Sequence, residues 1–372
     1  MNAERLHAIV LSLKKEMTER RIAASMKSMT STLRAVVQST NASTQQNFAN
    51  ARDTLYAGLT ETDSDKFSPT WRQILQEING EGLFGEVLKK TIETTLERNQ
   101  ITPAIALQEF EELLTRLEQF EGALDDTIEA FTYFKIGSEK LLPGECEIGI
   151  LIPRQYVKNQ LPEFVAELEK EQLILDTFSE VATGKTDKLE IKALSSSGLM
   201  VFLQSSPTSA AALAVAIERI VALYKQLLEI RKIRGDLQKE GIPEEVVKGV
   251  ETHANKVMED GIEKASVDIV NQFYTVDDSG RKNELVVKVR VSMNMLANRI
   301  DHGVNIEVRV EPPSKDDSKA KDETVGKAVA AIQAATSNMK FMRLQGQPLL
   351  QLPEKLRKEE KSEKSEKTRK KD

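Results

Sequence analysis

The feature that most constrains this chain is a long helical pattern over residues 206–237, which read SPTSAAALAVAIERIVALYKQLLEIRKIRGDL. Ser206 suits the N-cap and Pro207 the first helical position. Apolar residues recur mostly at spacings of three and four, and Arg234 interrupts them: Leu213, Ile217, Ile220, Tyr224, Leu227, Ile230 and Leu237. The pattern predicts one helix that ends near Gly241 and buries a narrow apolar stripe.

A second helical pattern follows at once, and Pro243, Glu244 and Glu245 mark its start. Its apolar stripe is comparable: Val246, Val250, Ala254, Val257, Ile262, Ala265, Ile269 and Phe273. At 1.5 Å per residue each helix is roughly 45–50 Å long. Because the connection around residues 241–243 is very short, we expect an antiparallel helical hairpin over residues 207–273.

Strand patterns precede this hairpin. Isoleucines alternate at positions 148, 150 and 152, after the turn signal Pro143-Gly144. A helical stretch over residues 159–183 comes next. The segments LEIKALSS and GLMVFLQSS then read as two strands, with Ser197-Gly198 as a tight turn between them. Strand, helix, strand, strand and helix make up most of a ferredoxin-like unit.

Two further strands are predicted after the hairpin, with the short helix NMLANRID between them and Gly303 as its C-cap. In ELVVKVRV the apolar residues share one face: Leu285, Val287, Val289 and Val291. In VNIEVRVEP, Val304, Ile306, Val308 and Val310 alternate with Asn305, Glu307 and Arg309. Both strands are expected to be half-buried and to complete the sheet. The predicted fold class is therefore helix-rich α+β.

Changes in composition divide the chain into four parts. Residues 1–140 carry helix signals and are expected to form a helical domain, in which Ser68-Pro69 starts one helix and Thr102-Pro103 another that runs to about Tyr133. Its polar stretch, residues 25–55, reads as a soft helix or as partly disordered. Residues 144–311 are the expected α+β domain. Residues 312–353 are expected to hold a linker, a helix and a docked extended segment, and residues 354–372 a disordered charged tail.

The composition of the chain indicates the cellular compartment in which the protein is expected. The chain has one cysteine, Cys146, which excludes an internal disulfide and is typical of a reducing compartment. The N-terminal apolar run at residues 8–13 is short and is followed by two lysines, without the pattern of a signal peptide. No stretch has the roughly 20 apolar residues of a membrane span. We therefore expect a cytoplasmic protein that has no membrane partner.

Few residues are candidates for chemistry. Gly184-Lys185-Thr186 resembles the end of a phosphate-binding loop, but position 179 is Ser179 where that motif needs glycine, and a strand pattern follows instead of a helix. A solvated loop is the better interpretation. His7, His253 and His302 lack a second histidine or cysteine at metal-ligand spacing. Cys146 has no histidine motif beside it and is interpreted as a structural thiol.

The charged residues give no sharper signal. Acidic residues such as Glu111 and Asp125 read as a solvated helix face, and pairing them as general acid and base would be arbitrary. Lys225, Arg231, Lys232 and Arg234 form a basic cluster that Glu229 and Asp236 interrupt, which is typical of a salt-bridged surface. The tail has nine basic and six acidic residues, so it is only mildly basic. We assign no catalytic, cofactor-binding or metal-binding residue.

Three functions remain open. The first is a non-enzymatic protein–protein interaction or scaffold protein that uses the protruding hairpin, with a protein partner or self-association. The second is an enzyme or enzyme subunit with a site built from scattered carboxylates, which a deep pocket lined by such acids would favour. The third is weak nucleic-acid binding through the basic helix face and the tail, which the formal net charge of −6 disfavours.

Overall fold

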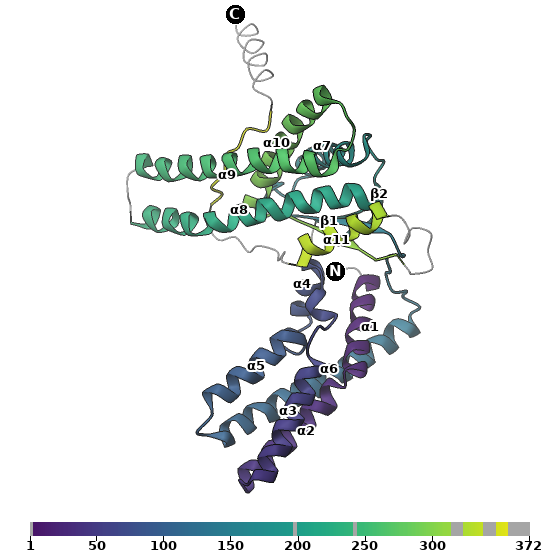
Figure 1. The fold of residues 1–372 in the computed structure, drawn as a ribbon, viewed down its shortest axis with the longest axis vertical. Helices are drawn as coiled ribbons and strands as arrows, with labels where there is room; N and C mark the ends of the chain where they lie inside the picture. The colour runs from purple at the N-terminus through teal and green to yellow at the C-terminus, as the bar shows by residue number, and fades with distance from the viewer. Residues whose placement is uncertain (1–2, 196–198, 241–243, 314–322, 338–346, 356–372) are drawn as a thin grey trace, which may run out of the picture. The chain divides into compact units, whose positions relative to one another are not determined.

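The computed structural model describes residues 3–195, 199–240, 244–313, 323–337 and 347–355. The chain divides into two compact units, Met1–Lys140 and Leu141–Asp372 (Figure 1). Together they make a helix-rich α+β protein, because the strands are confined to one small sheet in the second unit. None of the described helices is both long and apolar enough to cross a membrane.

The first unit is helical in its described residues. Its elements are α1 (Ala3–Glu19), α2 (Ile22–Gln38), α3 (Ala42–Gly58), the short 3-10 helix η1 (Ser64–Lys66), α4 (Pro69–Glu77), α5 (Gly85–Arg98) and α6 (Pro103–Tyr133). The predicted starts are confirmed at α4, where Ser68 accepts the amide of Trp71, and at α6, which begins at Pro103. The polar stretch that read as soft helix or disorder forms α2 and α3, with Asn41 capping α3.

The second unit contains four strands, β1 (Cys146–Ile152), β2 (Glu190–Ser195), β3 (Leu199–Ser205) and β4 (Asn305–Val310). They pair antiparallel in the order β2-β3-β1-β4. Ile150 of β1 lies opposite Val201 on one side and Ile306 on the other, which fixes the register. The turn predicted at Ser197-Gly198 lies outside the described residues.

Five helices accompany this sheet in the described part of the unit: α7 (Leu161–Thr183), α8 (Pro207–Lys239), α9 (Glu244–Phe273), α10 (Ser279–Asp301) and α11 (Glu323–Ser337). Ser206 caps α8 by accepting the amide of Ser209 at 3.3 Å. Helices α8 and α9 run antiparallel and side by side, and their linked ends extend past the sheet (Figure 1). Helix α7 packs against the part of α8 that lies away from its link to α9. Helix α11 also packs along α8.

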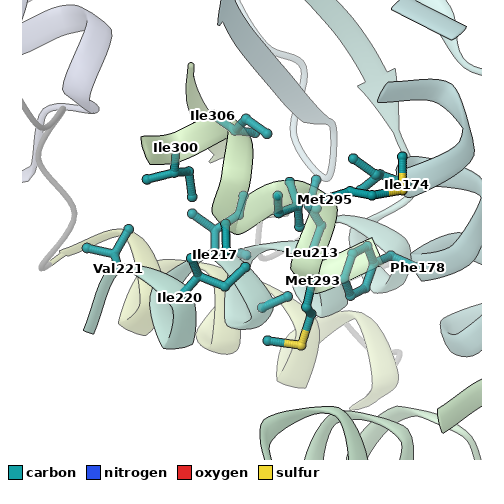
Figure 2. Packing of buried hydrophobic residues seen from close by; sticks show 14 of the residues in the cluster. Ile174, Phe178, Leu213, Ile217, Ile220, Val221, Met293, Met295, Ile300 and Ile306 are labelled. Atoms are coloured by element: carbon teal, nitrogen blue, oxygen red, sulfur yellow. The ribbon is translucent and has the colours of Figure 1, made fainter. Parts of the chain in front are cut away.

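The core of the second unit gathers around the first half of α8. Residues 210–214 of α8 are fully buried, because alanine at most of these positions lets the neighbouring elements approach closely. Figure 2 shows Leu213 and Ile217 of α8 among Phe178 of α7, Met293 of α10 and Ile306 of β4. The sheet and three helices therefore share one apolar cluster.

The strand predicted over residues 284–291 is wrong, whereas the helix predicted over residues 294–301 is present but begins earlier. The expected strand ELVVKVRV and the expected short helix NMLANRID are parts of one helix, α10. Its buried positions follow a helical period: Leu285, Val289, Met293, Leu296 and Ile300. Burial of that stripe outweighs the weak preference of valine for strands, which is worth well under 1 kcal/mol per residue.

Strand β4 forms as predicted, but it is not half-exposed. Glu307 has no exposed surface, and Glu147 on the neighbouring strand is 1% exposed. Arg309 pairs with Glu147 at 3.0 Å across the sheet. The polar side of β4 is therefore buried at Glu307 and only partly exposed at Asn305 and Arg309.

Candidate functional site

The Gly184-Lys185-Thr186 segment ends a helix instead of starting one. Gly184 is the C-cap of α7, in the left-handed conformation that favours glycine (φ 74°). The hydroxyl groups of Ser179 and Thr183 donate to the carbonyl of Lys185, and Ser179 also accepts the amide of Asp187. These contacts fold the segment back onto α7, with none of the geometry of a phosphate cradle.

Each of the three histidines lies in or at the end of a different helix. His7 contacts the carbonyl oxygen of Ile136 through Nδ1 at 2.8 Å, and His302 contacts the carbonyl of Asn298 at the end of α10 at 2.7 Å. His253 is exposed on α9. Among the described residues no group of three histidine, cysteine or acidic side chains is arranged to hold a metal ion.

Cys146 begins β1 and is 1% exposed. Burial raises the pKa of its thiol to about 12, and the charge of Glu145 acts in the same direction. The thiolate, which is the reactive form, is therefore scarce at neutral pH.

The two acids singled out on α6 do not converge. Glu111 pairs with Arg34 at 2.7 Å, and Asp125 pairs with Lys14 at 2.8 Å. The two residues are 14 positions apart on one helix, which separates their backbones by about 21 Å. Each carboxylate belongs to a surface ion pair.

The basic cluster on α8 is not the uniform salt-bridged surface that the sequence predicts. Lys225 and Lys232 are exposed, whereas Arg231 is 8% exposed and points inward. Arg231 donates to Oδ1 of Asp301 at 2.6 Å and also to the hydroxyl of Tyr224, which itself donates to Asp301. Asp301 has no exposed side-chain surface. Burial and the carboxylate of Asp301 raise the pKa of Tyr224, so the phenol stays protonated.

The second oxygen of Asp301 holds main chain from the C-terminal part of the protein. Its Oδ2 accepts the amides of Leu349 and Leu350 at 2.5 and 2.6 Å. Arg234 donates to the carbonyl of Pro348 at 2.8 Å and to that of Gln347 at 3.2 Å. One carboxylate and one guanidinium thus bind four consecutive residues of extended chain.

Asparagine side chains bind the rest of this segment. Asn298 accepts the amide of Leu352 and donates to its carbonyl, both at 3.0 Å. Asn255 of α9 accepts the amide of Gln351 at 2.7 Å, and Asn294 donates to the carbonyl of Pro353 at 2.9 Å. We call residues 347–354 the docked segment. The docking face is the set of side chains that binds it: Arg234, Asn255, Asn294, Asn298, Arg299 and Asp301.

A second charged cluster lies at one end of the docking face. The guanidinium of Arg299 is fully buried and pairs with Glu167 at 2.7 Å, with Glu171 at 3.4 Å and with Glu354 of the docked segment at 3.4 Å. Burial raises the pKa of Glu171 to about 8, and the neighbouring Glu167 acts in the same direction against the opposing charge of Arg299. Burial also raises the pKa of Glu167. Burial therefore favours the protonated form of Glu171.

Neither of two cavities among the described residues has the size and lining of a substrate pocket built from acids. One, beside Asp176 and Asp187, has a volume of about 10 Å³, which is close to the space of a single water molecule. The other is an open depression of about 640 Å³ between α2 and α3, whose lining is mostly small or neutral: Arg21, Ala24, Ser25, Ser28, Thr32, Asn47, Asn50, Ala51 and Thr54. The best-built polar arrangement is therefore the docking face.

The sequence contains one signal for this site that our prediction missed. Spacings of four and three from Leu213 through Leu227 place the next position of the stripe at Arg231, whereas the apolar residue next in the sequence is Ile230. An arginine on the buried stripe of a helix indicates a buried acidic partner. The partner, Asp301, lies 70 residues away, and only the fold brings the two together.

The comparisons with known proteins give no relative. No protein-family model, no curated protein and no solved structure matches this chain.

Proposed function

We propose that this chain is a non-enzymatic interaction or scaffold protein that uses the α8–α9 hairpin as its contact element. The observation that carries the proposal is the length of the pair: α8 has 33 residues and α9 has 30, and their linked ends extend past the sheet (Figure 1). A projecting pair of this length offers outward faces that the sheet and α7 do not cover. Such faces are suited to contact with a protein partner or with a second copy.

Apolar side chains on the outer surface of the hairpin support the proposal. Leu228 and Ile233 of α8 are 40% and 53% exposed, and Val267 of α9 is 41% exposed. Charged residues such as Lys225 and Lys232 lie near the first two on the same helix. Apolar side chains within a charged surround are the usual composition of a transient protein interface.

The alternative of an enzyme with scattered carboxylates has less support. The acids that converge, Glu167, Glu171 and Glu354, surround the buried Arg299, and the two cavities identified lie elsewhere. These acids pair with Arg299 inside the fold, and Glu354 belongs to the docked segment.

The alternative of a nucleic-acid binder is weakened by Arg231 and Arg234. Arg231 pairs with Asp301, and Arg234 pairs with Glu251 at 2.6 Å and binds the docked segment. Only Lys225 and Lys232 of the basic cluster are exposed, and two lysines contribute little to the binding of phosphates.

We also propose that the α+β part is a ferredoxin-like unit into which α9 and α10 are inserted. The support is the strand order β2-β3-β1-β4, with α7 between β1 and β2 and α8 after β3. In the ferredoxin-like pattern one helix joins β3 to β4, whereas here α8, α9 and α10 occupy that connection. The cytoplasmic location expected from the single cysteine stays a prediction.

The experiment is affinity capture with the full chain from the native host, followed by mass spectrometry, together with sedimentation analysis for self-association. The variant Leu228→Glu with Ile233→Glu places two charges at exposed positions of α8. We expect it to keep its fold and to lose the captured partner or the oligomer.

The matched control is Leu173→Glu on α7, where the leucine is 56% exposed and lies off the hairpin. This variant should capture the same partner as the unmodified chain. Capture that survives the hairpin variant, or that the α7 variant also removes, would contradict the use of the hairpin.

A further inference from the structure

We propose that the docking face is a binding site for an extended peptide and that the docked segment is its resident ligand, held in cis. The ligand class is a peptide with leucine at the positions of Leu349, Leu350 and Leu352 and an acid at that of Glu354. The source to which we commit is the same segment of a second copy of this chain. The docking face is a second site, distinct from the exposed apolar side chains of the hairpin.

The first support is that the docking face recognises main chain. Asn298 binds both the amide and the carbonyl of Leu352, which reproduces the pairing of a neighbouring β-strand. Asp301 and Arg234 bind two consecutive amides and two consecutive carbonyls. In peptide-binding proteins such main-chain contacts supply affinity for any extended chain, and side-chain contacts add the choice of sequence.

The second support is the pattern of buried side chains along the segment. Leu349, Leu350 and Leu352 are 2%, 2% and 4% exposed and belong to the core cluster, whereas Gln351 and Pro353 are exposed. At the end of the segment, Glu354 accepts from Asn298 at 2.9 Å and pairs with Arg299. The site therefore selects three apolar anchors and one acid.

The third support is that the docking face is held in place by contacts that do not involve the segment. Asp301 is fixed by Tyr224 and Arg231, and Arg234 pairs with Glu251. Arg299 pairs with Glu167 on α7. A site whose polar groups are already positioned loses little on ordering when a ligand enters, so it remains competent when the segment leaves.

The commitment to a second copy follows from the segment itself, since it carries each anchor that the site selects. Residues 338–346 separate it from the end of α11 at Ser337. The exchange of an identical segment between two copies keeps every contact of the site and adds no new one, which makes it a low-cost route to a dimer.

The first experiment tests whether the segment is a separable ligand. A site-specific protease sequence is inserted within residues 338–346 of the full chain, and the folded protein is cut. A labelled peptide of residues 347–355, QPLLQLPEK, is then added, and binding is followed by fluorescence anisotropy. We expect the cut protein to bind the peptide and to release its own fragment. Asn298→Ala should weaken binding by about tenfold or more, because a bidentate contact is lost.

Peptide variants provide matched controls. A peptide with Leu352→Asp should lose binding, because a charge replaces a buried anchor, whereas one with Gln351→Ala should bind as the parent does. Two outcomes would overturn the proposal. The cut protein either unfolds, or it stays folded and neither releases its fragment nor binds the peptide. In both cases the segment is a fixed part of the core.

The second experiment tests the source by complementation of uncut chains. One variant carries Leu350→Asp and Leu352→Asp, which damage the segment and leave its docking face open. The other carries Asn298→Ala and Asp301→Asn, which damage the docking face and leave its segment available. Each alone should be monomeric in light scattering, and a mixture should form a one-to-one dimer. A mixture that stays monomeric, while the peptide binds the cut protein, would overturn the assignment to a second copy.

Discussion

Glu171 belongs to the charged cluster between α7 and α10, and its protonation makes the stability of the native state depend on pH. Burial raises its pKa from the ordinary value of 4.5 to about 8, so the native state keeps a proton that the unfolded state releases. The free energy that protonated Glu171 contributes to the native state is fully present below pH 4.5. It declines as the pH rises towards 8. The groups that face Glu171 are Arg299, Glu167 and Glu354.

We predict that Glu171→Gln flattens this pH dependence. Glutamine keeps the neutral shape of the protonated acid, so stability at pH 5 should stay close to that of the unmodified protein. At pH 8 the variant should be more stable by on the order of 1–4 kcal/mol. Urea unfolding at several pH values measures this difference. Some slope should remain, because the pKa of Glu167 is raised as well.

The control for this prediction is Glu169→Gln on the same helix, where the side chain is exposed. It should leave the pH profile unchanged. An unchanged profile for Glu171→Gln would mean that Glu171 is ionised in the native protein and that Arg299 compensates its burial.

At the scale of single residues the sequence predicted caps better than buried charges. Ser206 and Pro207 mark the start of α8 because capping depends on residues within one turn. The ion pair of Arg231 with Asp301 joins two distant parts of the chain, and an arginine looks the same in sequence whether it faces solvent or a buried carboxylate. The spacing of the stripe was the available signal for Arg231. A docked extended segment is expected from the sequence, but no pattern identifies Asp301 as the residue that binds it.

At the scale of elements, the apolar contact between α8 and α9 is the feature most open to test. Leu227 is fully buried, and the neighbouring Leu228 is 40% exposed. We predict that Leu227→Asp destabilises the second unit by on the order of several kcal/mol, because it places a charge in an apolar contact. Amide exchange over residues 225–260 should become faster.

Leu228→Asp introduces the same charge one position along the helix and serves as the matched control. Its effect on stability should be within about 0.5 kcal/mol, as for most surface substitutions. If Leu227→Asp keeps its stability and loses an oligomer instead, then the stripe is an interface between molecules and not a contact within one.

Helix α8 was predicted correctly and the first part of α10 was not. The two sequences differ in how many regular patterns they fit. In α8, spacings of three and four are the only regular pattern, and the helix was predicted correctly. In residues 285–291 an alternating pattern of leucine and valine coexists with a helical stripe that starts at Leu285 and Val289. A short apolar run cannot distinguish the two, and the helix is decided by packing against α7, α8 and α9.

At the scale of the whole molecule, the charged tail should be dispensable for folding. Residues 356–372 lie outside the described part of the chain, and after Leu356 they contain no apolar residue. A segment without apolar side chains cannot offset the entropy cost of becoming ordered. We predict that deletion of these residues leaves the melting temperature unchanged within error. A decrease of several degrees would show that the tail docks on the protein.

The two units should fold independently, because each has its own apolar core. The main buried cluster of the first unit draws only on residues 9–124, and that of the second only on residues 146–352. We predict that residues 1–140 expressed alone are helical and unfold cooperatively in urea. The control variant is Leu13→Asp. Leu13 has no exposed surface, so a charge at this position should abolish the cooperative unfolding transition. If residues 1–140 bind hydrophobic dyes and melt without a transition, then their core requires the second unit to become fixed.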